Sequence, residues 1–171
     1  ETFSALIDKY LSEGGGVILF AYEHNIGKQF MSDIFGQWGA KIPVEQIVEQ
    51  DQNKLSSFSH MGYPAAFTDK INPSPVSKGV KGIWYPSQIA YNAQQTCPIW
   101  VNDDWQVVVS ASDTSITKAV DLNNSPSGPV DSPFIRPEGA KSPPLFAIRD
   151  YANGRIAFLS QYPQFSVGQG T

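Results

Sequence analysis

Residues 2–21 read TFSALIDKYLSEGGGVILFA, and this stretch decides the fold that the sequence predicts. The apolar residues ahead of the glycines recur at helical spacing, and Thr2 or Ser4 is suited to cap the start of a helix. The glycines at 14–16 then end the helix, because glycine adopts the positive φ of a helix C-terminus at little cost. Residues 17–21 are apolar without alternation, which is typical of a strand buried on both faces of a parallel sheet.

Further segments continue the alternation of helices and strands. A second amphipathic helix is predicted over about 26–38 and ends at Gly39, and residues 42–48 are predicted to form another strand. Near the end of the chain, residues 145–151 and 155–160 flank an Asn-Gly turn, which is the strongest hairpin signal in the sequence. Helix, strand, helix and strand joined by short links indicate an α/β layered fold.

The middle of the chain is rich in turn signals. Short strands are predicted at 65–67 and 82–85, and a more definite one at 105–109. Residues 121–144 are rich in proline and serine and contain no long apolar run, so we expect them to form a long loop.

The composition narrows the classes of function. The 171 residues have the length of one domain, and 41% of them are hydrophobic, so a packed core is expected. A formal net charge of −4 argues against nucleic acid or an anionic membrane surface as a partner. No apolar run is long enough to span a membrane, and the single cysteine, Cys97, excludes an internal disulfide and a cysteine-based metal site. The low lysine content and many serines favour a secreted or periplasmic protein.

Four stretches together carry a family resemblance. Residues 6–20 contain the helix, glycine turn and strand, 72–80 read NPSPVSKGV, 105–109 read WQVVV, and 143–160 contain a late hairpin with a Gly-Arg turn. In this order they resemble class I glutamine amidotransferase-like domains, in particular the ThuA-like branch. The resemblance implies an α/β, flavodoxin-like three-layer sandwich with a mainly parallel sheet and a late β-hairpin, formed by residues 1–171 as a single domain.

The resemblance also implies that this domain is incomplete at both ends. Domains of that family place a βαβ unit before the helix with which this chain opens, and they continue into a final helix. We therefore expect a fragment of a larger domain, whose partners are other domains of the same chain or further copies in a homo-oligomer.

The residues needed for amidotransferase catalysis are absent. The family places a nucleophilic cysteine on the turn after the buried strand, but here that turn reads Ala-Tyr-Glu-His-Asn at 21–25, and Cys97 is distant in sequence. The late His-x-Glu pair of the family is missing as well, and no Gly-x-Ser-x-Gly motif indicates a serine hydrolase. The sequence therefore predicts no catalytic residue.

Tyr22, Glu23 and His24 form the candidate ligand site. They follow a predicted buried strand, and open α/β sheets bind ligands at the carboxyl ends of their strands. The resemblance implies a ligand or metal role for His24. The alternative, which we favour, is that Glu23 caps the next helix and His24 is a solvated loop residue, because His60 is the one other imidazole. No metal and no cofactor are predicted.

Large aromatic residues cluster in the middle of the chain. They are suited to stack on a sugar ring or to form a protein interface, although core packing is the expected role of most of them. We take Trp84 and Trp105 as candidate walls of the ligand site. Asp103 and Asp104 are expected to lie in a solvated turn rather than to act as an acid/base pair. The cluster comprises Trp84, Tyr85, Tyr91, Trp100 and Trp105.

These features predict a non-catalytic, glutamine amidotransferase-like binding or assembly module of a larger protein, with carbohydrate as one candidate ligand. Two alternatives stay open. In the first, the chain is a ThuA-like hydrolase or sugar-modifying enzyme in which Glu23 and His24 act as acid and base. In the second, it is a structural subunit of a homopolymeric assembly in which neighbouring chains complete the sheet.

Overall fold

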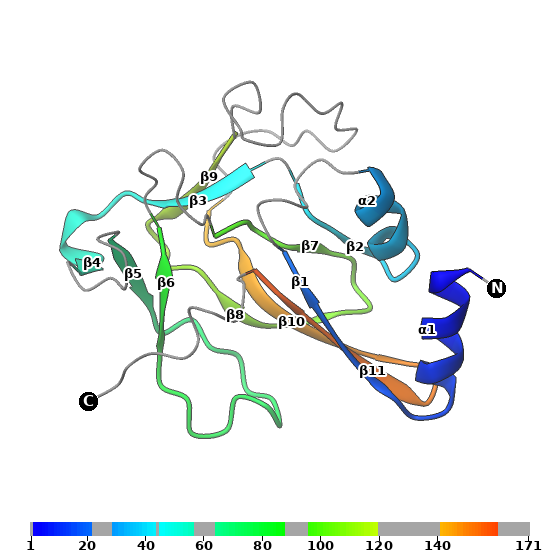
Figure 1. Ribbon diagram of the computed structural model, residues 1–171. Coiled ribbons are helices and arrows are strands. Elements are labelled where there is room, and N and C mark those ends of the chain that lie inside the picture. Colours follow the sequence, from blue (N-terminus) through cyan, green and yellow to red (C-terminus); the bar gives the residue numbers. More distant parts are fainter. Residues whose placement is uncertain are drawn as a thin grey trace.

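The structure, a computed structural model, describes residues 2–21, 29–43, 45–56, 64–87, 96–119 and 141–160. These residues form two α-helices, a short 3-10 helix and strands β1 to β11 (Figure 1). The bounds are α1 (Phe3–Ser12), β1 (Gly16–Phe20), α2 (Gln29–Gly36), β2 (Ala40–Lys41), β3 (Glu45–Glu49), η2 (Gln52–Lys54), β4 (Leu55–Ser56), β5 (Ala65–Thr68), β6 (Ile83–Pro86), β7 (Trp100–Val101), β8 (Gln106–Ser110), β9 (Ser115–Ala119), β10 (Pro144–Tyr151) and β11 (Gly154–Leu159).

The opening helix and strand form as the sequence predicts. Thr2 caps α1 by accepting a hydrogen bond on its Oγ1 from the backbone N–H of Ala5, at 3.3 Å. The helix ends at the glycine run, where Gly14 has a φ of +92° that a residue with a Cβ atom rarely adopts. The chain then enters β1.

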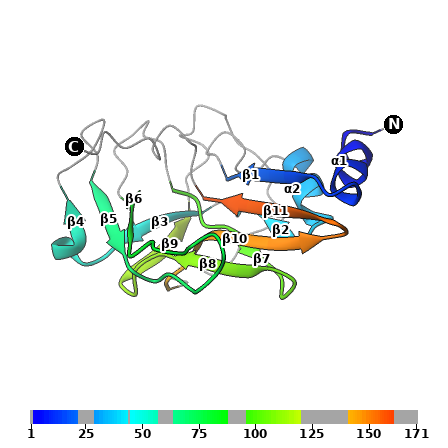
Figure 2. The same cartoon turned by 90° about the horizontal axis from the view of Figure 1, so that it is seen from below.

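The main sheet contains four strands in the order β1-β11-β10-β8, which Figure 2 shows side by side. β1 runs parallel to β11, whereas the β11–β10 and β10–β8 pairs are antiparallel. The predicted hairpin is confirmed, but its turn is centred one residue earlier than the Asn-Gly pair implies. Tyr151 pairs with Gly154, so Ala152, at a φ of +52°, and Asn153 form the turn.

The flavodoxin-like three-layer sandwich with a mainly parallel sheet, predicted from the sequence, is wrong. Within the described residues one strand pair is parallel, the others are antiparallel, and the strands are divided among four sheets. The apolar run 17–21 is not buried on both faces either, because β1 is the outer strand of the main sheet and the Ile18 side chain is 61% exposed. An unbroken apolar run fixes the strand but not its place in a sheet.

Several shorter elements match or modify the sequence predictions. The strands expected at 65–67, 82–85 and 105–109 are confirmed as β5, β6 and β8. The strand expected at 42–48 is confirmed in part as β3, which covers Glu45–Glu49, while β2 precedes the expected range and belongs to another sheet. β9 was not predicted, because its inward residues Ser115 and Thr117 are polar although both are fully buried. Of the predicted loop 121–144, residues 121–140 lie outside the described part of the chain.

Two apolar cores lie on the two faces of the main sheet. The first contains the buried residues of both helices, with Leu11, Phe35 and Trp38 packed against Ile156 and Phe158 of β11. The second joins β8 and β10 to the smaller sheets through residues that include Ile47, Ala66, Tyr85, Val108 and Ile148. The helices and the β2–β7 pair thus cover one face of the sheet, and the β3–β9 and β4-β5-β6 sheets cover the other. In the described residues no helix is long and apolar enough to cross a membrane.

The second helix is shorter than predicted. It covers Gln29–Gly36 within the expected range 26–38, and Ile34, Phe35 and Trp38 are buried as expected. Trp38 lies at the centre of the first core, where its Nε1 donates to Asp8 Oδ1 at 3.1 Å. Its carbonyl oxygen accepts hydrogen bonds from Trp105 Nε1 and Arg149 Nη1, both at 2.7 Å.

Candidate functional site

The residues predicted to form a ligand site do not meet in the described part of the structure. Tyr22, Glu23 and His24 lie outside the described residues, so their ligand role stays a prediction. Trp105 is 7% exposed and belongs to the first core. Trp84 is 54% exposed, and its ring packs on that of Phe67 with centroids 5.2 Å apart. The two tryptophans therefore have different surroundings.

The other aromatic and acidic candidates have identifiable roles in the fold. Tyr85 is fully buried and Trp100 is half-buried, which agrees with the packing role expected of most of the cluster, whereas Tyr91 lies outside the described residues. Asp103 and Asp104 lie in an exposed turn, as expected. Asp104 forms an ion pair with Arg149, with Oδ2 and Nη2 3.0 Å apart.

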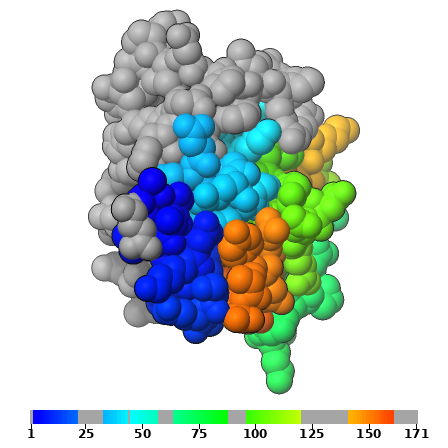
Figure 3. Space-filling view, turned by 90° about the vertical axis from the view of Figure 1, so that its right-hand side faces the viewer, coloured from blue at the N-terminus to red at the C-terminus, as the bar shows by residue number. Residues whose placement is uncertain are grey.

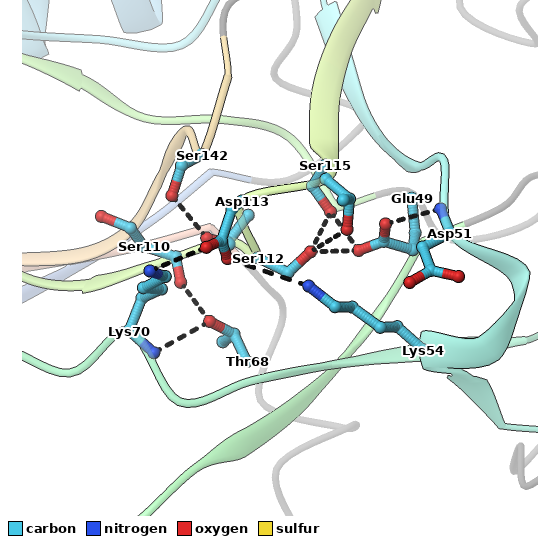
Figure 4. A network of polar contacts seen from close by, with 12 residues as sticks. Glu49, Asp51, Lys54, Thr68, Lys70, Ser110, Ser112, Asp113, Ser115 and Ser142 are labelled. Carbon is cyan, nitrogen blue, oxygen red and sulfur yellow. Dashed lines mark hydrogen bonds and ion pairs between the residues drawn. The ribbon is translucent and has the colours of Figure 1, made fainter.

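The main polar cluster in the described residues surrounds Glu49, at the end of β3 (Figure 4). Its side chain is 1% exposed. Oε2 accepts hydrogen bonds from the hydroxyls of Ser112 and Ser115, the latter at 2.9 Å, and Oε1 accepts one from the backbone N–H of Asp51 at 2.9 Å. The two serines come from the β8–β9 turn and the start of β9. One carboxylate therefore connects these two segments to the segment that follows β3.

Tyr85 extends this cluster to the next sheet. Its hydroxyl lies 2.6 Å from Ser115 Oγ and accepts a hydrogen bond from the backbone N–H of Ser112 at 3.1 Å. Ser87, just after β6, accepts the backbone N–H of Glu49 on its Oγ at 2.6 Å. The cluster of Glu49, Tyr85, Ser87, Ser112 and Ser115, which we call the Glu49 cluster, thus connects the β4-β5-β6 sheet to the β3-β9 pair.

The protonation states in the Glu49 cluster follow from these contacts. Burial raises the pKa of Glu49, but hydrogen bonds from Ser112, Thr114, the backbone of Asp51 and Ser115 outweigh it, and the pKa lies below its ordinary value of 4.5. Burial raises the pKa of Tyr85 above its ordinary value of 10.0. At neutral pH the cluster therefore holds an ionised carboxylate and a neutral phenol.

A surface ion cluster lies beside the Glu49 cluster. Asp113 Oδ2 is 2.9 Å from Lys70 Nζ, and Asp113 Oδ1 is 3.8 Å from Lys54 Nζ. The hydrogen bond with Lys70 lowers the pKa of Asp113, and the same contact raises the pKa of Lys70. All three groups are solvated, so water and salt weaken their attraction.

The geometry of the Glu49 cluster favours a structural role over catalysis. A serine nucleophile needs a reachable hydroxyl and a base that accepts a proton near neutral pH. Ser112 is 2% exposed and Ser115 is fully buried, while the lowered pKa makes Glu49 a weak base. Among the described residues no group of three or more His, Cys, Asp or Glu is placed to hold a metal ion.

Glu49 was not predicted as a functional residue, although the sequence around it contains a signal. Glu45, Ile47 and Glu49 alternate along β3, so all three lie on the face that Ile47 directs into the core. The run of hydroxyl residues at 110–115 then follows an apolar strand and supplies the donors that a buried carboxylate needs. Ser112 and Glu49 are 63 residues apart, and only the β3–β9 pairing joins the two signals.

Together, these elements define a domain in which a mixed four-stranded sheet is covered on one face by two helices and the β2–β7 pair, and on the other by two small antiparallel sheets. No family model matches the sequence, and no curated protein matches it. A solved structure described as "mmIFT52 N-terminal domain" is similar, with a TM-score of 0.56 and 13% sequence identity. The match covers 91% of this chain and 57% of that chain. At this identity the likeness shows the fold alone.

These findings correct the family resemblance drawn from the sequence. The class I glutamine amidotransferase-like and ThuA-like assignment is wrong, because the sheets are mostly antiparallel and no model of that family matches. The quoted stretches contain a helix, a glycine turn and a hairpin, which many folds share. The ThuA-like enzyme alternative loses its basis with the resemblance.

Proposed function

We propose that this chain is a non-catalytic module that binds another protein surface in an assembly. The observation that carries the proposal is a stripe of large apolar side chains that α1 exposes to solvent. Phe3 is 61%, Leu6 49% and Tyr10 54% exposed. We call these three residues the α1 surface.

The spacing of the helical residues strengthens this interpretation. Phe3, Leu6 and Tyr10 are three and four positions apart, so they form one stripe along α1. Leu11 is fully buried and packs a different side of the helix, about 100° around the axis from Tyr10, against the first core. A helix held in this way presents the stripe outward, and Figure 3 shows α1 at the molecular surface, beside the tip of the β10–β11 hairpin. An exposed stripe of large apolar side chains on one face of a helix is the kind of feature that marks an interaction site in a soluble protein.

The polar chemistry of the described residues points the same way. The Glu49 cluster is closed to solvent and stabilises the contact between sheets, which leaves it no access to a substrate. The likeness in fold to the mmIFT52 N-terminal domain is compatible with a module of this kind and adds no activity to the proposal.

The test compares retained proteins on three immobilised forms of the chain, using extract of the source cells and quantitative mass spectrometry. The first form is wild type, and the second carries Phe3→Ser and Leu6→Ser. The third carries Val76→Ser and Val80→Ser, a matched control because these valines are 48% and 43% exposed but lie between β5 and β6. We expect partners that wild type and control retain and that the helix variant loses. Equal retention by all three forms would contradict the proposal.

A further inference from the structure

The outer edge of β1 has unpaired hydrogen-bonding groups within the described residues. Arg155 N–H donates to Gly15 O at 3.1 Å, and Ala21 N–H donates to Leu159 O at 2.7 Å, so residues 15 and 21 direct their backbone groups toward β11. Backbone groups alternate in direction along a strand. Gly16, Ile18 and Phe20 therefore direct their N–H and C=O groups toward the other edge, where no described segment pairs with them.

Nothing in the sequence of β1 protects this edge. Proteins blunt an open edge with lysine, proline, a bulge or a covering segment, and Gly16-Val-Ile-Leu-Phe20 contains neither a charge nor a proline. Its register with β11 is continuous from Gly16 to Phe20, without a bulge. The strand is a regular, apolar template for a further strand.

We propose that a second copy of this chain adds its own β1 to this edge, antiparallel, around a two-fold axis that passes through Ile18. This inference rests on the proposed function and specifies its partner. The axis places Ile18 opposite Ile18 of the second copy and Gly16 opposite Phe20. All three residues direct their backbone groups outward, so each of these pairs exchanges reciprocal hydrogen bonds.

The strand is complementary to itself in this register, which is what a two-fold interface requires. A Cβ atom added to Gly16 would meet nothing within 4 Å, so there is open space above this glycine. The Phe20 ring of the second copy fills that space, an arrangement that stabilises glycine in a sheet. The pairing also brings the two exposed Ile18 side chains together across the axis.

The first experiment measures mass by sedimentation velocity over a range of concentrations. We expect wild type to reach twice its 18.7 kDa. Ile18→Lys and Ile18→Glu should each raise the dimer dissociation constant at least about tenfold, because like charges face each other at the axis. A mixture of the two variants should form a heterodimer, since position 18 faces itself. Val80→Lys, at a residue 43% exposed and remote in sequence, should leave the dimer intact.

Hydrogen exchange tests the pairing without a substitution. In wild type, protection of the Gly16, Ile18 and Phe20 amides should rise with protein concentration. Val17 and Leu19 donate toward β11 and should be protected at every concentration. This readout holds even if an Ile18 variant fails to fold.

The outcomes separate this inference from the proposed function. A wild-type monomer up to about 100 μM, or a dimer that Ile18→Lys leaves unchanged, overturns pairing through β1. If the wild-type monomer still retains partners whose binding depends on Phe3 and Leu6, the assembly function stands and another polypeptide binds the exposed residues of α1. If neither a dimer nor such a partner is found, both proposals fail.

Discussion

Glu49 shows how a single residue holds separate segments of this chain together. An ionised carboxylate is costly to bury unless donors surround it, and here two serine hydroxyls and a backbone N–H supply them. The lowered pKa of Glu49 means that the folded state prefers the charged form. The carboxylate therefore contributes stability in a way that depends on pH.

Replacement of Glu49 by glutamine tests this contribution. Glu49→Gln should lower the free energy of unfolding by about 1–3 kcal/mol at pH 7, because buried donors lose a charged acceptor. The folded pKa lies below 4.5, so the contribution is complete above about pH 4.5 and is lost as the pH falls through the folded pKa. The difference in free energy of unfolding between wild type and Glu49→Gln should therefore become smaller in acid. Urea unfolding at several pH values measures it, with the exposed Glu13→Gln as control. A constant difference at all pH values would contradict this assignment.

The contact between the β10–β11 hairpin and α1 depends on a close approach of two backbones. Asn153 Nδ2 donates to the carbonyl of Ser12 at 2.8 Å, so the turn residue satisfies the C-terminal end of the helix. Gly154 lies directly against the helix end. A Cβ atom there would clash with the carbonyl oxygen of Gly15 and would lie 2.7 Å from that of Leu11.

Substitution of Gly154 therefore separates two elements without removing any side chain. Gly154→Ala should destabilise the fold by about 2 kcal/mol or more, because the obstructing atoms belong to backbone and cannot rotate away. Gly36→Ala is the control, since a Cβ atom at Gly36 meets nothing within 4 Å. Thermal unfolding followed by circular dichroism compares the two. Equal unfolding temperatures of the Gly154→Ala and Gly36→Ala variants would show that the hairpin does not pack closely against α1.

At the scale of the whole molecule, one sheet serves two cores. Ile156 and Phe158 of β11 belong to the first core, whereas Ala157 between them packs against the second. Each core is small, and each depends on the other to hold the shared strands in place. We therefore expect the described residues to unfold as one cooperative unit.

A cavity in the first core tests this coupling. Phe158 is fully buried, with ring centroids 5.3 Å from Phe35 and 6.2 Å from Trp105, so Phe158→Ala should cost about 3–5 kcal/mol. Amide exchange at Ile47 and Val108, in the second core, should accelerate by the same factor as exchange at Ile156. Wild-type protection in the second core would mean that the two cores unfold separately. Phe67→Ala, at a residue that is 38% exposed, should lower the free energy of unfolding clearly less than Phe158→Ala does.

Local sequence signals account for several elements of this protein. Periodicity and the glycine run predicted α1 and β1, and the turn signal predicted the β10–β11 hairpin, because these depend on neighbours within a few residues. The short strands β5, β6 and β8 followed from the same local rules. The two exposed aspartates at 103 and 104 were placed correctly in a turn for this reason.

The pairing of these elements, and the polar groups that this pairing brings together, depend on contacts between distant parts of the chain. The apolar run of β1 has the composition of a buried central strand, yet it lies at the edge, because strand order depends on contacts between residues about 140 positions apart. Glu49 was not among the predicted site residues, because only the β3–β9 pairing brings Ser112 and Ser115 to it. Long-range pairing leaves no trace in local spacing. Local signals therefore predicted α1, β1, β8 and the β10–β11 hairpin but not β9, and packing set the strand order, the Glu49 cluster and the open edge of β1.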